Sequence, residues 1–188
     1  NDASVGQRLT VREGFSLGLY ADNVPKARFL RPTAHGDLLV SQPRLGQILL
    51  LARDANGDGR PDGQRVLIDG LDRPHGLDIA GGWLYIGESG AVGRIAFDAA
   101  TGSVSGDYER ILTGLPEGGN HWSRTVRVGP DGWLYVTIGS SCNVCAEEHA
   151  WRAAMLRLRP DGSGVELHAT GLRNSVGFDW APWSGRSE

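Results

Sequence analysis

The chain has 188 residues, of which 40% are hydrophobic and 22% are charged, a composition typical of a globular domain. Its 19 basic residues are outnumbered by 22 acidic ones, which gives a net charge of −3. This balance, without any run of Lys or Arg, argues against nucleic acid as a partner. The longest uninterrupted apolar stretch, Ile48–Ala52, is far too short to cross a bilayer, so no membrane span is expected.

Turn-forming residues are frequent along the whole chain. The 28 glycines and nine prolines favour an all-β fold with many short strands. Residues 9–21 alternate apolar and polar side chains in part and predict a first pair of strands. Further strands are predicted, in chain order, at residues 27–30, from Leu38, from Ile48, and at 65–68, 76–79, 83–87, 92–97, 124–128, 133–138, 154–158 and 165–169.

A turn followed by a short apolar strand occurs three times, at His35–Ser41, Gly82–Gly87 and Asp131–Thr137. The matching apolar triplets begin 46 and 50 residues apart, a period typical of β-propeller blades. The turn of a fourth copy stands at Ala181–Glu188. The sequence therefore predicts one partial six-bladed β-propeller over residues 1–188, with blades at about 9–53, 64–99 and 108–160 and the start of the next at 164–188.

Three blades leave two open ends, because each sheet of a propeller needs a neighbour on either side. Exposed sheet faces and edges invite association. We therefore expect the chain to pair with a copy of itself or with a complementing half-propeller.

The loop Asp54–Gly63 places oxygen-bearing side chains at positions 1, 3, 5 and 9 of a calcium-loop template. The candidate calcium ligands are Asp54, Asn56, Asp58 and Asp62 by side chain and Arg60 by its carbonyl. Position 12 is Arg65 and not Glu, which argues against an EF-hand. Two interpretations stay open: a structural calcium site, or a hairpin of Asx turns that binds nothing.

The two cysteines, Cys142 and Cys145, are three residues apart. This spacing suits a tight local disulfide, a pair of free thiols or half of a metal site. No second cysteine pair or nearby histidine pair completes a zinc site, so we favour the disulfide or the free thiols over metal.

His121 lies among glycines and polar residues just before a predicted strand, where a propeller exposes side chains at the mouth of its channel. An imidazole at this place is able to act as a general base. A hydrogen-bonded structural histidine is the alternative, and local context alone favours it. For His75 in the second repeat, too, a structural role is the preferred interpretation.

Four segments closely resemble the glucose/sorbosone dehydrogenase family: Gly118–Cys145, Gly171–Trp180, Arg73–Leu77 and Glu13–Ala21. The most specific signal is His121 ahead of Arg124-Thr125 and of the Gly-Pro-Asp-Gly-x-Leu-Tyr strand, with Gly171-Leu-Arg-Asn174 further along. Members of that family are six-bladed propellers that oxidise aldoses or related polyols with pyrroloquinoline quinone (PQQ) and calcium. The resemblance covers nearly all of this chain but only the first half of a family member.

The resemblance implies roles for individual residues. His121 matches the base that removes the hydroxyl proton at the anomeric carbon, and Arg173 and Asn174 match residues that contact the quinone. Arg124 is a further candidate for positioning anionic groups. Position 175 is Ser where the family commonly has Pro, and the family's calcium loop and further basic contacts belong to the half that this chain lacks.

We therefore expect a quinoprotein dehydrogenase that acts on an aldose or similar sugar once a second half or copy completes the site. A periplasmic or secreted location is expected, because it is the usual location for the family and because a disulfide persists there. The first alternative is a non-catalytic half-propeller that self-associates. The second is a calcium-dependent lactonase or esterase on a similar propeller, for which the sequence shows no inward-facing set of acidic and Asn ligands.

Overall fold

The computed structural model describes residues 9–181 of the chain. Within this part the secondary structure consists of twelve β-strands, with no helix. There is accordingly no helix among the described residues that is long and apolar enough to traverse a membrane. The predicted all-β class is confirmed.

The strands form three four-stranded antiparallel sheets, each built from consecutive strands. The first sheet contains β1 (Phe29–Pro32), β2 (Leu38–Gln42), β3 (Gln47–Leu51) and β4 (Gln64–Ile68). The second contains β5 (Leu77–Ala80), β6 (Trp83–Gly87), β7 (Ala91–Asp98) and β8 (Ser103–Thr113). The third contains β9 (Val126–Val128), β10 (Leu134–Ile138), β11 (Ala154–Leu158) and β12 (Glu166–Thr170).

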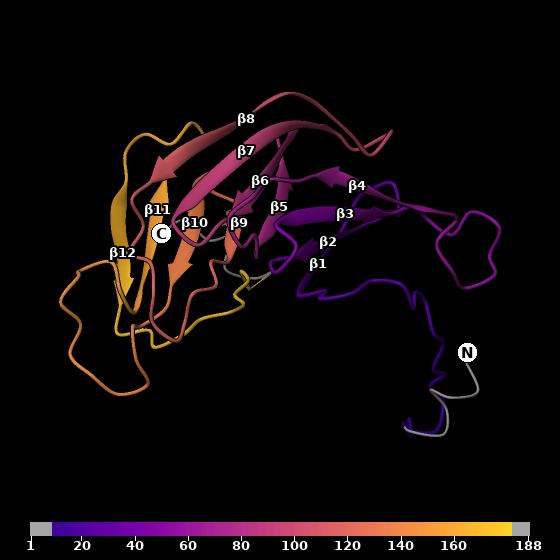
Figure 1. Ribbon diagram of the computed structural model, residues 1–188, viewed down its shortest axis with the longest axis horizontal. Helices are drawn as coiled ribbons and strands as arrows, with labels where there is room; N and C mark the ends of the chain where they lie inside the picture. The colour runs from indigo at the N-terminus through magenta and orange to yellow at the C-terminus, as the bar shows by residue number, and fades with distance from the viewer. Residues whose placement is uncertain (1–8, 182–188) are drawn as a thin grey trace.

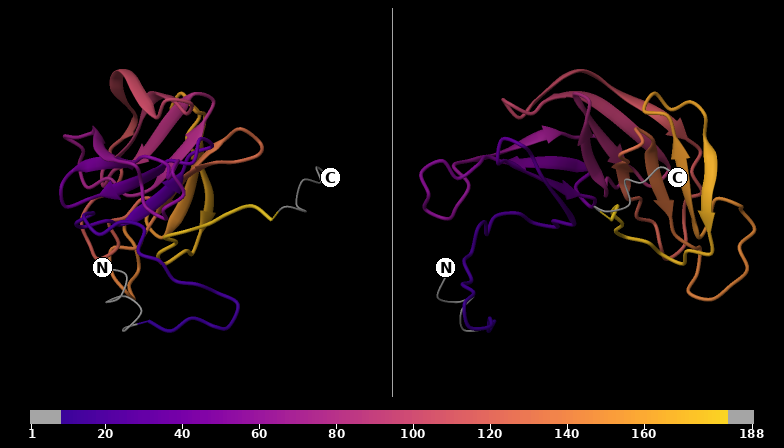
Figure 2. Two further views of the ribbon diagram at one scale, coloured as in Figure 1. Left: turned by 90° about the vertical axis from the view of Figure 1, so that its right-hand side faces the viewer. Right: turned by 180° about the vertical axis from the view of Figure 1, so that it is seen from behind.

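The sheets stand side by side as the blades of a partial β-propeller, and they form an open arc (Figures 1 and 2). The first strand of each sheet is innermost, since β5 contacts both β1 and β9. One apolar core fills the space between the first and second sheets, with Leu39 and Ile48 facing Leu84 and Ile86. A second core lies between the second and third sheets.

That second core is made of Tyr85, Val92 and Leu112 from one sheet and of the buried side chains of β9, β10 and β11 from the next. Burial of these two apolar layers is the main force that orders the blades. The outer face of the first sheet has its own small cluster, where Tyr20 and Val24 pack on Val40, Leu49 and Leu51.

Neighbouring blades approach each other closely at Gly76. Its backbone N–H donates to the carbonyl oxygen of Arg124 at 2.9 Å. A Cβ atom at position 76 would lie 2.6 Å from that oxygen and 2.7 Å from the Cα atom of Thr125. Only glycine leaves room for this contact between the second and third blades.

A ladder of ion pairs crosses the inner strands from blade to blade. The carboxylate of Asp78 on β5 lies 2.6 Å from the guanidinium of Arg31 on β1 and 3.8 Å from that of Arg127 on β9. Arg127 in turn lies 3.1 Å from the carboxylate of Asp179. Asp78 is almost fully buried, with 2% of its surface exposed, so the centre of the ladder is shielded from solvent.

The segment that follows β12 returns to the third sheet. The hydroxyl of Thr125 donates to the carbonyl of Val176 at 2.8 Å, and the hydroxyl of Thr137 donates to the carbonyl of Ser175 at 2.7 Å. Trp180 packs against Tyr135 on β10. Residues 172–181 therefore cover the outer face of the third blade, where a fourth blade would begin, and the rest of the predicted fourth repeat, 182–188, lies outside the described residues.

Two predictions about the strands differ from the structure. Residues 9–21 contain no strand: Phe15 is 72% exposed and Leu9 is 57% exposed, because no neighbouring strand offers them a partner. The blade boundaries are also displaced by one strand. Residues 64–68 pair with β3 and close the first blade, 103–113 close the second, and 166–170 close the third.

Candidate functional site

The loops of the propeller emerge on two opposite sides. Consecutive strands are antiparallel, so the segment before the first strand of a sheet and the loop after its second strand lie on the same side. We call this side the site rim; it comprises residues 23–28, 43–46, 69–76, 88–90, 114–125, 139–153 and 171–176. The loop 139–153, in orange, and the loop 52–63 of the opposite rim, in purple, lie far apart (Figure 1).

His121 is half-buried on the site rim and is oriented by Ser140. Its Nδ1 atom lies 2.9 Å from the carbonyl oxygen and 2.9 Å from the hydroxyl oxygen of Ser140. A carbonyl oxygen can only accept a hydrogen bond, so Nδ1 carries the proton. In the neutral ring this leaves the lone pair on Nε2, which is the arrangement that a general base requires.

Gly139 allows three segments of the site rim to meet. A Cβ atom at this position would collide with Cβ of His121 and would lie 3.0 Å from Oδ1 of Asn174. The next residue, Ser140, donates its backbone N–H to the carbonyl of Arg173 at 2.7 Å. The structure thus brings together His121, Arg173 and Asn174, which the sequence analysis singled out.

Arg124 is fully buried, with 0% of its surface exposed. Its guanidinium donates to the carbonyl oxygens of Pro116 at 2.6 Å and of His121 and Ser123 at 3.2 Å each. Burial, followed by the charge of Arg152, lowers the pKa of Arg124 to about 10. The side chain remains charged at neutral pH and ties the loop that carries His121 to the preceding turn.

Arg173 is exposed, and its Nη1 atom donates to Oδ1 of Asn143 at 3.2 Å. Within residues 9–181 it forms no ion pair. No carboxylate of the described residues balances its positive charge, which suits an anionic group.

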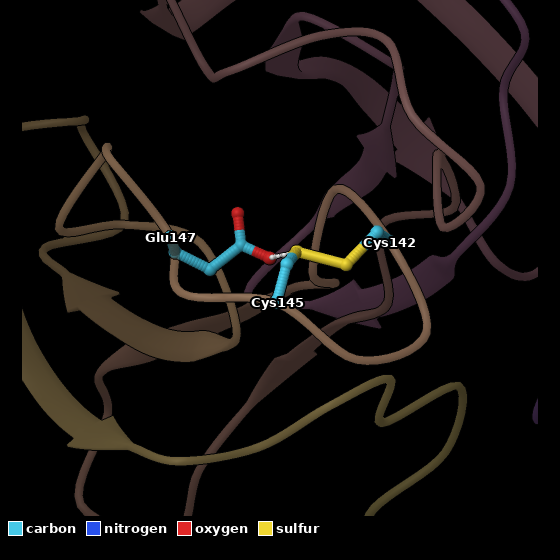
Figure 3. A group of neighbouring side chains, drawn as sticks. All are labelled: Cys142, Cys145 and Glu147. Carbon is cyan, nitrogen blue, oxygen red and sulfur yellow. Dashed lines mark hydrogen bonds between the residues drawn. A yellow bond between two sulfur atoms is a disulfide. The ribbon is translucent and has the colours of Figure 1, made fainter.

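Cys142 and Cys145 are joined in a disulfide in the loop 139–153. Glu147 lies beside it, with Oε1 3.5 Å from Sγ of Cys145 (Figure 3). In the described part of the chain these three residues are the only group of three His, Cys, Asp or Glu ligands within 4.8 Å of one another, but the two sulfurs are bonded to each other. The hydroxyl of Ser140 donates to the carbonyl of Cys142 at 2.6 Å. The disulfide loop therefore also holds Ser140, the hydrogen-bond partner of His121, in place.

A model of the TrAA12-like family matches residues 9–186, nearly the whole chain. The chain belongs to the TrAA12-like family. The fold is similar to that of the PQQ domain of pyranose dehydrogenase from Coprinopsis cinerea in its holo form, with a TM-score of 0.69 and 22% identity over 81% of this chain and 38% of that one. No curated protein matches the sequence.

Two further solved structures resemble this TrAA12-like chain. One is the calcium structure of a family AA12 carbohydrate-active enzyme from Trichoderma reesei, with a TM-score of 0.66 and 20% identity over 79% of this chain and 38% of that one. The other is the PQQ-bound aldose sugar dehydrogenase from Streptomyces coelicolor, with a TM-score of 0.56 and 21% identity over 76% of this chain and 47% of that one. The chain spans less than half the length of these structures, and the predicted resemblance to PQQ-dependent sugar dehydrogenases is confirmed.

The predicted calcium loop of this TrAA12-like chain lies on the opposite rim from His121. Its acidic side chains accept hydrogen bonds from the loop's own backbone: Asp54 accepts from Gly57, Asp58 and Gly59, and Asp62 accepts from Ala55. Asn56 and Asp58 form further Asx turns. The loop is therefore built of Asx turns, and its calcium binding stays a prediction.

His75 is the buried histidine of the site rim, and 3% of its surface is exposed. Its Nδ1 atom lies 3.3 Å from the carbonyl of Arg124, and its ring packs against Phe29 and Trp122. Burial is the main cause that lowers the pKa of His75 to about 4, with smaller contributions from the charges of Arg28 and Arg124. The favoured structural role agrees with these contacts.

The titration of His75 predicts how stability depends on pH. The pKa of His75 falls from 6.5 in the unfolded chain to about 4 in the folded one, so the unfolded chain binds more protons between these pH values. The free energy of unfolding therefore decreases by about 3 kcal/mol as the pH falls from 6.5 to 4. Urea unfolding at pH 7 and pH 4 should show this loss in the wild type and a smaller one in His75→Phe. The control is His168→Phe, at an exposed position, which should lose as much free energy of unfolding between pH 7 and pH 4 as the wild type. An equal loss in His75→Phe would contradict the assignment.

Proposed function

We propose that this chain forms part of a PQQ-dependent dehydrogenase that oxidises an aldose or related polyol, with His121 as the general base. The observation that carries this proposal is the hydrogen bond from Nδ1 of His121 to the carbonyl of Ser140, which directs the free lone pair to Nε2. Arg173 and Asn174 on the same rim support it, as does membership of the TrAA12-like family.

The residues of the site rim fit the quinone in their chemistry. PQQ is a flat aromatic tricarboxylate, and the guanidinium of Arg173, which forms no ion pair within residues 9–181, suits a carboxylate or a quinone oxygen. The amide of Asn174 offers both a donor and an acceptor beside it. When bound, PQQ supplies the acceptor for the two electrons that leave the sugar carbon as hydride.

The chain's own residues manage the proton. Nε2 of His121 takes the proton of the sugar hydroxyl, and the carbonyl of Ser140 stabilises the resulting imidazolium through Nδ1–H. We propose that Arg124 is a positioning residue and makes no direct contact with the quinone, because its buried guanidinium bonds to three loop carbonyls. It fixes the backbone of His121 without reaching the surface.

A structural calcium ion in the loop 54–62 stays a prediction, and none of the described residues is proposed to hold calcium beside the quinone. The acidic loop 54–62 uses its oxygens internally, and within residues 9–181 the single candidate cluster contains the disulfide. No catalytic step is therefore assigned to calcium, and the calcium ion of the cofactor is expected in the half that the family has beyond this chain.

A complementing half-propeller or a second copy is proposed to complete the pocket, because the arc of blades is open (Figure 2). A periplasmic or secreted location agrees with the disulfide, which persists in oxidising compartments.

Titration with PQQ of the assembled protein that contains this chain tests the proposed function. A ligand that binds only the folded state adds about 2.7 kcal/mol to the free energy of unfolding at one hundred times its dissociation constant, so thermal unfolding should shift upward. Arg173→Gln should weaken binding by about tenfold, since it removes a charged donor. The matched control Arg159→Gln, on the opposite rim, should bind PQQ as the wild type does. Absence of any shift at saturating PQQ would favour the non-catalytic half-propeller.

A further inference from the structure

The disulfide of the site rim closes a ring of four residues, Cys142–Cys145, which we call the disulfide ring. This ring reaches the candidate base through Ser140, whose hydroxyl donates to the carbonyl of Cys142 at 2.6 Å. Because the hydroxyl has a single hydrogen, its oxygen can only accept from Nδ1 of His121, 2.9 Å away. The position of Cys142 therefore sets the direction in which Ser140 offers its lone pair to the imidazole.

The disulfide ring also contacts the arginine that is proposed to bind the quinone. Oδ1 of Asn143, inside the ring, accepts a hydrogen bond from Nη1 of Arg173 at 3.2 Å. The backbone N–H of Ser140 donates to the carbonyl of the same arginine at 2.7 Å. The loop thus holds Arg173 by its main chain and by its side chain, and the disulfide ring supplies the second of these contacts.

The disulfide acts locally and is not mainly a staple of the whole fold. The stabilisation that a disulfide gives grows with the length of the loop that it closes, and these two cysteines are only three positions apart. Val144, at the tip of the ring, is 95% exposed, and Asn143 and Cys145 are exposed as well. What the disulfide fixes is the direction of the Cys142 carbonyl and of the Asn143 side chain.

The disulfide ring is open to a reductant, and a neighbouring carboxylate suits its reduced form. Cys145 is exposed, so an attacking thiolate can reach its sulfur. Oε1 of Glu147 lies 3.5 Å from that sulfur (Figure 3). A sulfur in a disulfide has no hydrogen to donate, whereas the thiol of reduced Cys145 can donate to this carboxylate. The loop therefore already contains an acceptor for the thiol that reduction creates.

We propose that the Cys142–Cys145 disulfide is a switch that dithiols reduce, and that only its oxidised form holds His121 and Arg173 in place. The switch rests on the proposed function, in which these two residues serve proton removal and quinone binding. Reduction breaks the bond between the two sulfurs. The dithiol is oxidised to its own disulfide, and its two electrons and two protons convert both cysteines to thiols. The Cys142 carbonyl and the Asn143 amide then lose their fixed directions.

Hydrogen exchange of the assembled protein without PQQ tests whether the disulfide orders the site rim. Three backbone amides report on the loop 139–153: Asn120 donates to the carbonyl of Ser141 at 2.9 Å, Ser140 donates to Arg173, and Ser141 donates to Glu147 at 2.8 Å. Reduction with dithiothreitol is expected to speed exchange at these amides about tenfold, whereas strand β6 should keep its rate. Unchanged exchange after complete reduction would overturn the proposal.

The double variant Cys142→Ser, Cys145→Ser is the matched control for the reductant, because this chain has no other cysteine. Its amides should exchange as fast as those of the reduced wild type, with and without dithiothreitol. A further response of this variant to dithiothreitol would place the effect elsewhere in the assembled protein and would contradict the switch.

PQQ binding and turnover provide a second readout. Reduction is expected to weaken PQQ binding about fivefold, the effect of losing one hydrogen bond that orients Arg173. It should also lower kcat at full PQQ occupancy about tenfold, because the base is less well placed. Asn143→Leu should weaken PQQ binding to the same extent without any reductant, and Val144→Thr, in the same ring, should leave it unchanged.

The two readouts separate the switch from the proposed function. If Asn143→Leu bound PQQ as the wild type does, the link between the disulfide ring and Arg173 would be wrong. If the assembled protein bound no PQQ, the proposed function would fail, whereas faster exchange of the reduced protein would still support the switch.

Discussion

Replacement of Asp78 by Asn is expected to lower the free energy of unfolding by about 3–5 kcal/mol, the usual cost of removing one partner of a buried ion pair. The Asp78 carboxylate accepts the backbone N–H of Val128 at 2.6 Å as well as pairing with Arg31 and Arg127. The Nε atoms of both arginines are buried without a hydrogen-bond partner. Asn keeps the shape but removes the counter-charge of Arg31 and leaves Arg127 with only the exposed carboxylate of Asp179, at the junction of three blades.

Asp179→Asn is the matched control for this prediction. Asp179 pairs with Arg127 at the end of the same ladder, but its side chain is 73% exposed, so solvent screens the pair. Urea unfolding at neutral pH should show a large decrease in midpoint for Asp78→Asn and almost none for Asp179→Asn. Similar midpoints for the two variants would show that burial of the carboxylate does not matter.

The ladder was absent from the sequence analysis, although its members share a pattern. Asp78, Arg127 and Asp179 each stand between two apolar residues, in Leu-Asp-Ile, Val-Arg-Val and Phe-Asp-Trp. The repeat used to find the blades lies one strand later, in the Leu-Tyr phrase. Alternation of charge sign at one repeat position would have predicted contact between neighbouring inner strands.

The second strand of each blade was located correctly because its turn and its buried apolar residues leave a strong local signal, as at β6 and β10. The outer strands carry no such signal. β4 and β12 are largely exposed, so their side chains show little periodic burial, and the choice of partner strand depends on the connecting turns. The sequence therefore predicted the number of sheets and misplaced their boundaries.

The candidate site, too, was predicted only in part. The resemblance pointed to His121, Arg173 and Asn174, and the structure places them on one rim. The role of Ser140 could not be predicted, because it depends on the close approach at Gly139 of loops far apart in sequence. Nor was complete burial of Arg124 expected, since arginine is usually exposed unless its charge is compensated; here loop carbonyls satisfy its Nη atoms.

Replacement of His121 by Gln in the PQQ-loaded protein that contains this chain is expected to lower kcat by about 10²–10⁴-fold, the usual contribution of a general base. Glutamine occupies a similar space and can still donate to the carbonyl of Ser140, but it cannot accept the hydroxyl proton. PQQ binding by the variant should stay unchanged, because the residues proposed to hold the quinone are Arg173 and Asn174. Steady-state kinetics with a saturating sugar gives the rate, and the PQQ titration gives the occupancy.

His149→Gln supplies the control for His121→Gln, because His149 is exposed in the loop 139–153 and packs against Trp151. Its kcat should stay close to that of the wild type. If both variants lost activity equally, the effect would belong to the loop and not to the base. If His121→Gln kept wild-type kcat at full PQQ occupancy, proton removal by Nε2 would be excluded, and the hydrogen bond from Nδ1 to Ser140 would have only a structural role.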